Sequence, residues 1–568
     1  MRADHRHLGA AIRTGLIWGG IGVFLSLVGM IEVFAKREII LGVVSLGHTL
    51  LLLTVLAAGY QAALREPRGG AAPMVLRGIL AGAAASVVGS AFIALGTLVN
   101  LRAMFVSASP DLFLILSFGR GVAGIPLVHL FGAAVGLIGA AASLVPAAVR
   151  RPVAIGLATA LIVGLFQELL QIMLQEGSIR SAIREFLFTS DGLPPRGALI
   201  LFVIAGGASV LWRGRGAVVR GRFLRLPPAR RRVVRLVAIG LAVAAALLVP
   251  KATGLFLSQV FVLVGLYTLM GLGLNLEVGF AGLLDLGFVA FFAIGAYTVG
   301  LLTSIGEYGL FHLSFWAAVP VALVVSLIAG VLFGLPILGI RGDYLAIATL
   351  GFGEIIRLLV LSDFLRPWLG GSQGVLGIPK PHIGSFEFSG PLQIYYLALV
   401  ASAFIAFVAS RLRDSRLGRA WMALREDEDV AEAMGIDLIN VKLLAYGIGG
   451  AFAGMGGAIF AVMLGSVFPH SFSILISINV LALIIVGGMG SLPGVVVGSL
   501  FLVGLPELLR EFSDFRFLIY GVALVLMMQL RPEGLWPAAA VKRELHGSEE
   551  TALPEKGTSL VGQEGSDG

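Results

Sequence analysis

The sequence predicts an all-α, polytopic integral membrane protein. Of its 568 residues, 58% are hydrophobic and only 13% are charged, and the mean hydropathy is +0.96. A soluble globular domain is about half apolar and about a quarter charged. Apolar runs of about 20 residues, the length that spans the hydrocarbon core of a bilayer, recur along the chain. Because a bilayer offers the backbone no water, these runs must be helical, and we expect roughly 16 transmembrane or re-entrant helices.

The distribution of charged residues predicts how the chain is oriented in the membrane. The formal net charge is +8, with 41 Lys and Arg residues against 33 Asp and Glu. The arginines gather in short loops between apolar runs, which is typical of cytoplasmic loops rather than of a nucleic-acid-binding surface. We therefore expect a multi-pass protein of a bacterial-type cell (inner) membrane, surrounded by the lipid bilayer, with both termini in the cytoplasm and no nucleic-acid partner.

The sequence excludes several kinds of chemistry. The chain has no cysteine, so disulfides, thiolate metal sites and cysteine nucleophiles are ruled out. Its eight histidines are scattered and do not gather with acidic residues as a membrane-embedded enzyme would need. No G-x-x-x-x-G-K-[ST] phosphate loop occurs, so the chain cannot hydrolyse ATP through such a site. We predict no catalytic residue, no metal site and no cofactor in this chain.

Composition divides the chain into four parts. Residues 1–212 form a membrane module of about six spans, beginning with an uncleaved first span, and the sequence does not indicate its role. Residues 213–235 contain nine arginines and a Pro-Pro pair, which predicts a cytoplasmic linker. A second module of about ten spans covers residues 236–540. The polar, glycine-rich tail at 541–568 is expected to be disordered.

One segment of the second module, residues 411–436, is unusually charged. It carries five arginines and six acidic residues in 26 positions. Leu417, Trp421 and Leu424 follow helical spacing, and an acidic bend joins this helix to a second short helix that stops at Gly435. One interpretation is an amphipathic helix lying on lipid. Anionic lipid would repel the acidic cluster, so a soluble protein partner fits better.

Glycines of the second module cluster within 271–287, 449–457 and 486–494. The simpler interpretation is close packing of helices through small residues. The other is that 275–287 and 486–494 are broken or re-entrant elements, in matching positions of two halves, which line a solute pathway. Ionisable groups inside a membrane are functional candidates, with a cytoplasmic turn as the alternative position of Glu277. The candidate pathway residues are Asn275, Glu277, Gly282, Asp285, Gly487, Gly488 and Gly490.

Several long motifs of the second module carry a family resemblance. They occur in order and without large gaps over roughly residues 236–540. Together they resemble the M-type subunit of the branched-chain amino acid ABC transporter permeases. The motifs are LGLNLEVGFAGLLDLGFVAFFAIGAYT (272–298), IRGDYLAIATLGFGEIIRLL (340–359), GGSQGVLGIP (370–379), LREDEDVAEAMGIDLINVKLLAYGIGGAFAGMGGAIFA (424–461), IIVGGMGSLPGVVVGSL (484–500) and LIYGVALVLMMQLRPEGLW (518–536).

The resemblance implies an ABC importer permease core, to which residues 1–212 add an N-terminal multi-span extension. Such a permease works with ABC ATPase subunits that bind the ATP, a second permease subunit of the H type, and a periplasmic or extracellular solute-binding protein. In this family a cytoplasmic helix docks in a cleft of the ATPase, a role that falls here to the segment near 411–436. The residues implied in ATPase coupling are Trp421, Leu424, Arg425, Glu426, Asp427, Glu428, Glu432, Ala433, Met434 and Gly435.

We therefore expect the transmembrane permease subunit of an ATP-driven importer, with ATP hydrolysis by partner chains. The resemblance favours branched-chain (hydrophobic) amino acids as solutes. Related permeases carry urea or short amides, and no residue of the sequence chooses between these solutes. An ion-coupled secondary transporter would also explain the spans and glycines, but it would leave segment 411–436 without a partner.

Overall fold

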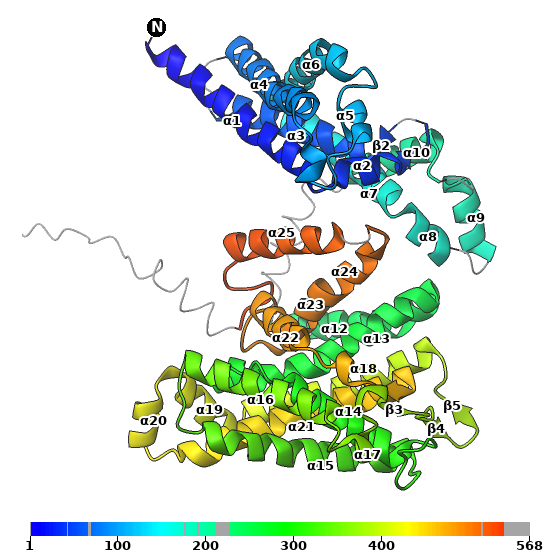
Figure 1. Ribbon diagram of the computed structural model, residues 1–568, viewed down its shortest axis with the longest axis vertical. Coiled ribbons are helices and arrows are strands. Elements are labelled where there is room, and N and C mark those ends of the chain that lie inside the picture. Colours follow the sequence, from blue (N-terminus) through cyan, green and yellow to red (C-terminus); the bar gives the residue numbers. More distant parts are fainter. Residues whose placement is uncertain are drawn as a thin grey trace, which may run out of the picture. The chain divides into compact units, whose positions relative to one another are not determined.

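The computed structural model is almost entirely helical (Figure 1), and it describes residues 2–42, 44–65, 70–174, 178–189, 192–211, 228–512 and 515–538. Within these residues, 11 helices are long and apolar enough to cross a membrane. The shorter apolar helices are Pro195–Leu211, Val243–Thr253, Val289–Thr303, Leu492–Leu508 and Phe515–Leu530. The predicted all-α, polytopic fold class is confirmed. The expected tail at 541–568, and residues 213–227 of the expected linker, lie outside the described residues.

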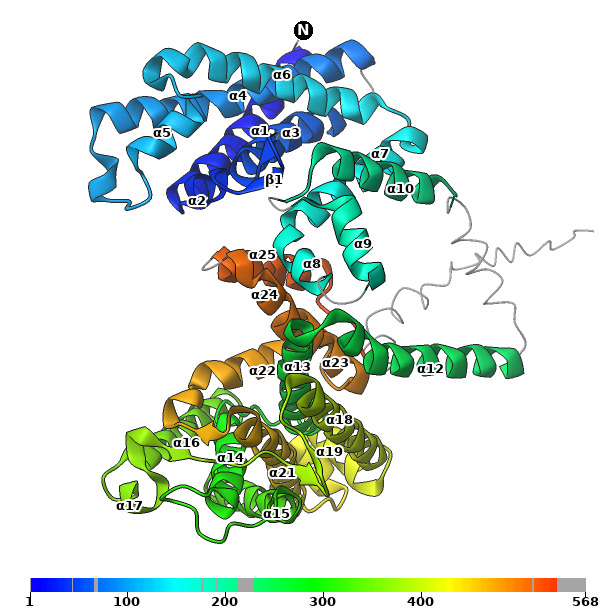
Figure 2. The ribbon, with the colours of Figure 1, turned by 90° about the vertical axis from the view of Figure 1, so that its right-hand side faces the viewer.

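The chain divides into two compact units, Met1–Leu241 and Ala242–Gly568. In the first unit, α1, α3, α4 and α6 pack against one another, and α7 pairs with α10 (Figure 2). Two short strands, β1 and β2, form an antiparallel pair. The elements of this unit are α1 (Arg2–Leu27), α2 (Met30–Ala35), β1 (Glu38–Ile40), β2 (Val44–Ser45), α3 (Leu46–Leu64), α4 (Ala71–Leu98), α5 (Pro110–Leu116), α6 (Ile125–Leu144), α7 (Ala147–Leu165), α8 (Gln167–Met173), α9 (Ser178–Leu187) and α10 (Pro195–Leu211).

Small residues bring the helices of the first unit into backbone contact. A Cβ on Gly82 of α4 would collide with the carbonyl oxygen of Gly132 on α6. A Cβ on Gly59 of α3 would collide in the same way with Gly136 of α6. Since apolar side chains gain little by leaving lipid, close backbone approach and dispersion contacts are what hold such helices together. This explains why the module is rich in glycine and alanine along its helix contacts.

The helix α12 (Pro228–Thr253) leads into the second unit, so residues 228–235 of the expected linker are helical. The second unit begins with α13 (Leu255–Leu274), π-helix η4 (Asn275–Phe280), α14 (Val289–Thr303), α15 (Phe315–Gly334), α16 (Asp343–Leu361), α17 (Arg366–Leu369), β3 (Val375–Leu376), β4 (His382–Ile383), β5 (Phe386–Glu387) and α18 (Pro391–Arg413). It continues with α19 (Arg416–Glu426), α20 (Glu428–Ala433), α21 (Leu438–Leu464), β6 (Ser466–Val467), α22 (Ile474–Gly487), α23 (Leu492–Ser499), π-helix η8 (Leu500–Gly504), α24 (Leu505–Leu508) and α25 (Phe515–Leu530).

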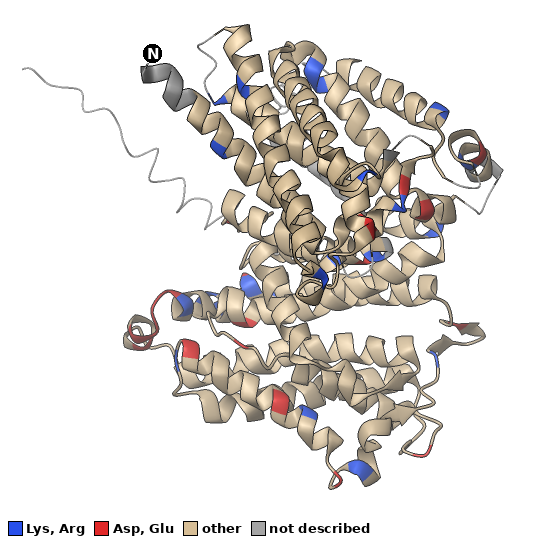
Figure 3. Cartoon of the chain, turned by 45° about the horizontal axis from the view of Figure 1, so that its top comes forward, with Lys and Arg blue, Asp and Glu red and all other residues tan. Residues whose placement is uncertain are grey.

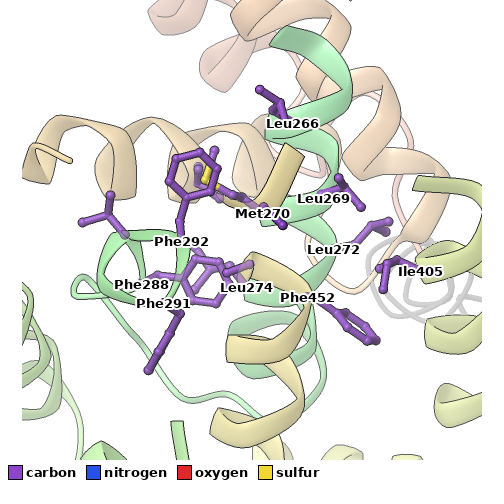
Figure 4. Close-up of a cluster of buried hydrophobic side chains, with 14 of the residues drawn as sticks. Leu266, Leu269, Met270, Leu272, Leu274, Phe288, Phe291, Phe292, Ile405 and Phe452 are labelled. Atoms are coloured by element: carbon purple, nitrogen blue, oxygen red, sulfur yellow. The ribbon is translucent and has the colours of Figure 1, made fainter. Parts of the chain in front are cut away.

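The core of the second unit lies where α21 packs against α13, α14 and α15. Glycines on α21 make this possible, since Gly454 approaches the backbone of Gly295 on α14. Around them, large apolar side chains of α13 and α14 interlock with α18 and α21 (Figure 4). The labelled side chains of this cluster are Leu266, Leu269, Met270, Leu272, Leu274, Phe288, Phe291, Phe292, Ile405 and Phe452.

Charged residues are sparse and sit mostly at helix ends and in the connections between helices (Figure 3). This is the distribution expected of helices whose middles lie in hydrocarbon, because a charge at the centre of a bilayer is costly. Glu354 and Arg357, one turn apart on α16, form an ion pair with each other. The arrangement is that of a multi-pass membrane protein.

Candidate functional site

The charged segment 411–436 consists of the end of α18 and two short helices. The Ser415 hydroxyl caps α19 by accepting a hydrogen bond from the amide of Gly418. The Asp427 carboxylate caps α20 by accepting from the amides of Asp429 and Val430, both at 3.0 Å. Beyond α20, Gly435 has a φ of 85°, a left-handed conformation that favours glycine. Local sequence features therefore define both helices.

One face of α19 attaches this helix to the body of the second unit. Trp421 is fully buried, and its Nε1 donates a hydrogen bond to the carbonyl oxygen of Val441 at 2.9 Å. Leu424 is buried on the same face. Val441 lies in the first turn of α21, so α19 and the start of α21 are held as one piece. A buried indole whose N–H is satisfied provides both packing and a fixed orientation.

Arg425 connects α19 to the π-helix η4. Its Nη1 donates a hydrogen bond to the carbonyl oxygen of Gly279 at 2.7 Å. That carbonyl belongs to the last turn of η4, where carbonyl groups lack a partner within the helix. A Cβ on Gly282 would lie only 3.0 Å from Cγ of Arg425, and Gly282 has a φ of 73°. Glycine at this position therefore leaves room for the arginine stem.

The two glycine-rich elements singled out in the sequence meet in the structure. The amide of Gly490 donates a hydrogen bond to Oδ1 of Asn275 at 2.9 Å, across 215 positions of the chain. Gly488 and Gly490 have φ values of 111° and 76°, and they interrupt the helical path between α22 and α23. Gly487 packs directly on the backbone of Gly494. The hydrogen bond from Gly490 thus joins the break after α22 to the start of the π-helix.

Both ionisable candidates of the pathway are buried. Glu277 lies in η4, within the candidate span Leu255–Phe280, and its carboxyl group is against Gly449 of α21. The structure thus places Glu277 in a π-helix and not in a turn, with its side chain fully buried. Asp285 follows η4 and accepts a hydrogen bond from the amide of Gly287 at 2.7 Å. The two carboxyl groups lie next to each other.

Two basic residues that sequence reasoning missed hold part of the acidic bend. Arg341 forms ion pairs with Asp429 at 3.0 Å and with Glu428 at 3.3 Å. Its hydrogen bond to Asp429, and then the nearby charge of Glu428, raise the pKa of the Arg341 guanidinium. Lys442 of α21 is buried and pairs with the other oxygen of Glu428. No local pattern marks these two cations, because both lie far from the bend in sequence or on the following helix.

The remaining surface of α20 is exposed. Val430 and Met434 are 58% and 79% exposed, and Ala433 lies beside them on the same face. Glu426 and Glu432 are also exposed, and within the described part of the chain neither of them forms an ion pair. The second short helix thus presents a small apolar face flanked by two exposed carboxylates.

The chain segment after α25 was not among the sequence candidates, yet it returns to the break after α22. The amides of Leu535 and Trp536 donate hydrogen bonds to the carbonyl oxygens of Val486 and Gly487, at 2.8 and 2.9 Å. A cleft of about 920 Å³ lies between this segment, Gly279 and Arg425. The only sequence signal for this contact was the family motif that ends at Trp536.

The second unit combines broken, glycine-rich helices with buried ionisable groups. This architecture is typical of membrane transport proteins. The comparisons agree. Residues 256–530 match the family model described as "Branched-chain amino acid transport system / permease component". The chain belongs to this permease family, and the resemblance found in the sequence is confirmed. It is a multi-pass permease component of a transport system.

Individual relatives support this assignment. The high-affinity branched-chain amino acid transport system permease protein LivM of Salmonella typhimurium is 43% identical over 295 residues, which cover 48% of this chain and 68% of LivM. LivM of Escherichia coli is 42% identical over the same shares. The permease protein LivH of Salmonella typhimurium is 24% identical over 302 residues, covering 49% of this chain and 95% of LivH. No solved structure shows significant similarity to the chain.

Proposed function

We propose that this permease imports branched-chain amino acids and is driven by separate ABC ATPase subunits that bind α20. The matched family and LivM are both described as permeases of branched-chain amino acid transport, which supports this solute class over urea or short amides. The chain lacks a phosphate-binding loop, so the energy would come from partner chains. On this proposal the purified chain alone hydrolyses no ATP.

The observation that carries the proposal is the exposed face of α20. Val430 and Met434, one turn apart, remain largely exposed although α20 is capped at both ends. A short helix that presents apolar residues at i and i+4 is suited to a groove in a partner protein. Glu426 and Glu432 beside it would add charge complementarity, which directs association and excludes wrong partners.

The contacts of α19 provide a route for the movement of α20. The two helices are continuous except for Asp427, so a force on α20 would reach α19 directly. From α19, Trp421 would carry the movement to α21, and Arg425 would carry it to η4. The bond between Asn275 and Gly490 would extend it to the break after α22. Closure of the ATPase would thereby act on the buried Glu277 and the glycine-rich elements around it.

The proposed assembly has two permease chains. One chain carries a single coupling segment, and two ATPases that act as a pair would need two. Similarity to LivH over half of the chain fits a second permease subunit of the H type with the same core. We further propose a solute-binding protein on the outer side, a bacterial-type inner membrane, and both termini in the cytoplasm, as the arginine-rich loops favour.

The test is co-purification with the ATPase and uptake of labelled leucine in cells or vesicles. Met434→Glu places a charge on the apolar face of α20, and we expect ATPase recovery and uptake to fall at least tenfold. Arg416→Gln, an exposed change on α19, is the matched control and should leave both unchanged. Normal uptake together with normal ATPase recovery in Met434→Glu would overturn the proposal.

A further inference from the structure

The first unit contains a cavity that the proposed function does not use. Its volume is about 270 Å³, close to the lower end of the range of small-molecule sites, and it is lined by α1, α3, α4, α5 and α6. Its lining residues come from the end of the bundle where α1 and α4 finish and where α3 and α6 begin. The short helix α5 closes this end, with Phe113 of α5 against Phe92 of α4.

The lining determines which molecules could enter. It contains no Asp, Glu, Lys or Arg, and most of it is aliphatic or aromatic. Moving an ionised group from water into such surroundings, without a group of opposite charge beside it, costs at least several kcal/mol because the group loses its hydration. An amino acid zwitterion, the solute proposed for the transport pathway, is therefore excluded. The cavity suits an uncharged molecule.

The few polar groups of the lining are already hydrogen-bonded within the first unit. The hydroxyls of Ser26, Thr54 and Ser86 each donate to a carbonyl oxygen of their own helix, at 2.7 to 2.8 Å. The Ser86 hydroxyl also has a hydrogen bond with Nδ1 of His129 at 3.0 Å. A hydroxyl has one donor and two acceptor positions, so Ser26 and Thr54 offer acceptor positions to a ligand. His48 also lines the cavity, and its Nδ1 forms a hydrogen bond with the Ser45 hydroxyl at 2.7 Å. A ligand hydroxyl, which can both donate and accept, therefore suits the polar part of this lining.

We propose that this cavity binds an uncharged, mainly aliphatic molecule that carries a hydroxyl group, of which a medium-chain alcohol is the simplest representative. The alkyl chain of the ligand fills the apolar volume between Phe92, Phe118 and Phe131, and its hydroxyl donates to the oxygen of Ser26 or Thr54. The N-terminal module is then a binding module for a lipid-like molecule, added to the permease core. This goes beyond the proposed transport of amino acids and does not depend on it.

Two glycines provide a substitution that fills the cavity and a matched control substitution outside it. Gly89 lines the cavity on the same face of α4 as Ser86 and Ile93, and a Cβ placed on it meets no atom within 4 Å. Gly89→Leu would therefore place a side chain in the cavity, and its Cβ would meet no atom of the walls. Gly20 of α1 also has open space where a Cβ would lie, but it is exposed and does not line the cavity. Both changes replace glycine within a helix, so their effects on helix propensity are equal.

The experiment is photolabelling of the full-length chain in lipid nanodiscs with a diazirine analogue of 1-decanol. We expect saturable labelling of peptides from α1, α3 and α4, competed by 1-decanol. The carboxylate analogue of the same length should label these peptides at least fivefold less at pH 8. Gly89→Leu should reduce labelling at least fivefold, whereas Gly20→Leu should match the unaltered chain.

Folding is checked by gel filtration and by the unfolding temperature of each variant. A nearly isosteric change, Thr54→Val, supplies a second test if Gly89→Leu fails to fold. It removes one acceptor, and it should weaken labelling by the alcohol but not by a diazirine alkane of the same length. Labelling that does not saturate, or that is equal in folded Gly89→Leu and Gly20→Leu, would mean simple partition into the bilayer and would overturn the proposal. Equal labelling by alcohol and carboxylate would overturn it as well.

Discussion

Arg425 Nη1 and the carbonyl oxygen of Gly279 are 2.7 Å apart, although the two residues are separated by 146 positions. This hydrogen bond joins α19, the first helix after α18, to the π-helix that contains Asn275 and Glu277. Arg425 also lies on the wall of the cleft formed with Gly490 and the segment after α25. A single side chain therefore contacts the proposed coupling helices and both glycine-rich elements.

Arg425→Met should uncouple the transporter without dissociating it. The methionine keeps much of the apolar stem but loses every donor, and a hydrogen bond from a charged group contributes about 1.5–3 kcal/mol. We expect leucine uptake to fall at least tenfold, while the ATPase still co-purifies and its ATP hydrolysis no longer responds to the loaded binding protein. Uptake assays and ATPase assays on the same reconstituted preparation measure both effects.

The control for Arg425→Met is Arg416→Met on the same helix, where the arginine is exposed. This variant should transport normally. If both variants transport normally, the bond between Arg425 and Gly279 has no part in coupling. If Arg425→Met loses the ATPase altogether, Arg425 acts in docking and not in transmission.

Glu426→Lys combined with Glu432→Lys separates a protein partner from a lipid surface. Both residues are exposed, so the double variant should insert and fold normally. A partner with a complementary basic surface would be repelled, and we expect ATPase recovery and uptake to be lost. On an anionic membrane the same change would strengthen surface binding, by about 1 kcal/mol for each positive charge near the surface. If α20 binds a protein partner, the double variant should recover less ATPase in a pull-down. If α20 lies on lipid, the double variant should bind anionic vesicles more strongly in a flotation assay. Unchanged ATPase recovery would mean that these two glutamates have no role in binding the ATPase.

Gly435→Val tests the end of α20. The space around Gly435 is open, but its φ of 85° is strained for any side chain and most of all for a β-branched one. We expect a local cost of about 1–3 kcal/mol, relieved by a change in the path between α20 and α21. Limited proteolysis at 433–438 and ATPase recovery should both report it. Gly339→Val, at a glycine with open space and no positive φ, is the control; equal effects of the two changes would argue against backbone strain.

Glu428→Gln and Asp429→Asn distinguish the buried ion pair from the exposed one. The side chain of Lys442 is 5% exposed, and Glu428→Gln takes away the charge that balances its buried ammonium group, which also donates to the carbonyl oxygen of Leu338 at 3.3 Å. Loss of one partner of a buried pair costs about 3–5 kcal/mol. Asp429 is 76% exposed, so water screens its pair with Arg341 and the pair adds little to stability. Unfolding of the purified variants should therefore show a large loss for Glu428→Gln and a small one for Asp429→Asn; similar losses would contradict this assignment.

Local patterns in the sequence were sufficient for the membrane fold class and for the outline of segment 411–436. Apolar runs of bilayer length specify helices because the bilayer leaves the backbone no other way to satisfy its polar groups. Local residues determine where α20 begins and ends, since Asp427 caps its first turn and Gly435 permits the positive φ that follows it. These features depend on neighbours within a few residues.

Contacts between distant parts of the chain came only from the tertiary structure. The pairing of Asn275 with Gly490, the return of Trp536 to Gly487, and the bond between Arg425 and Gly279 join positions tens to hundreds of residues apart. The composition around Glu277 was compatible with a water-exposed turn, and only the packing of η4 against Gly449 placed this carboxyl group in the interior. The sequence by itself thus determined which segments are helical and where helices can break, because backbone satisfaction and conformational freedom are local. Which of the breaks meet was decided by helix packing, because close approach depends on small residues on both partners at once.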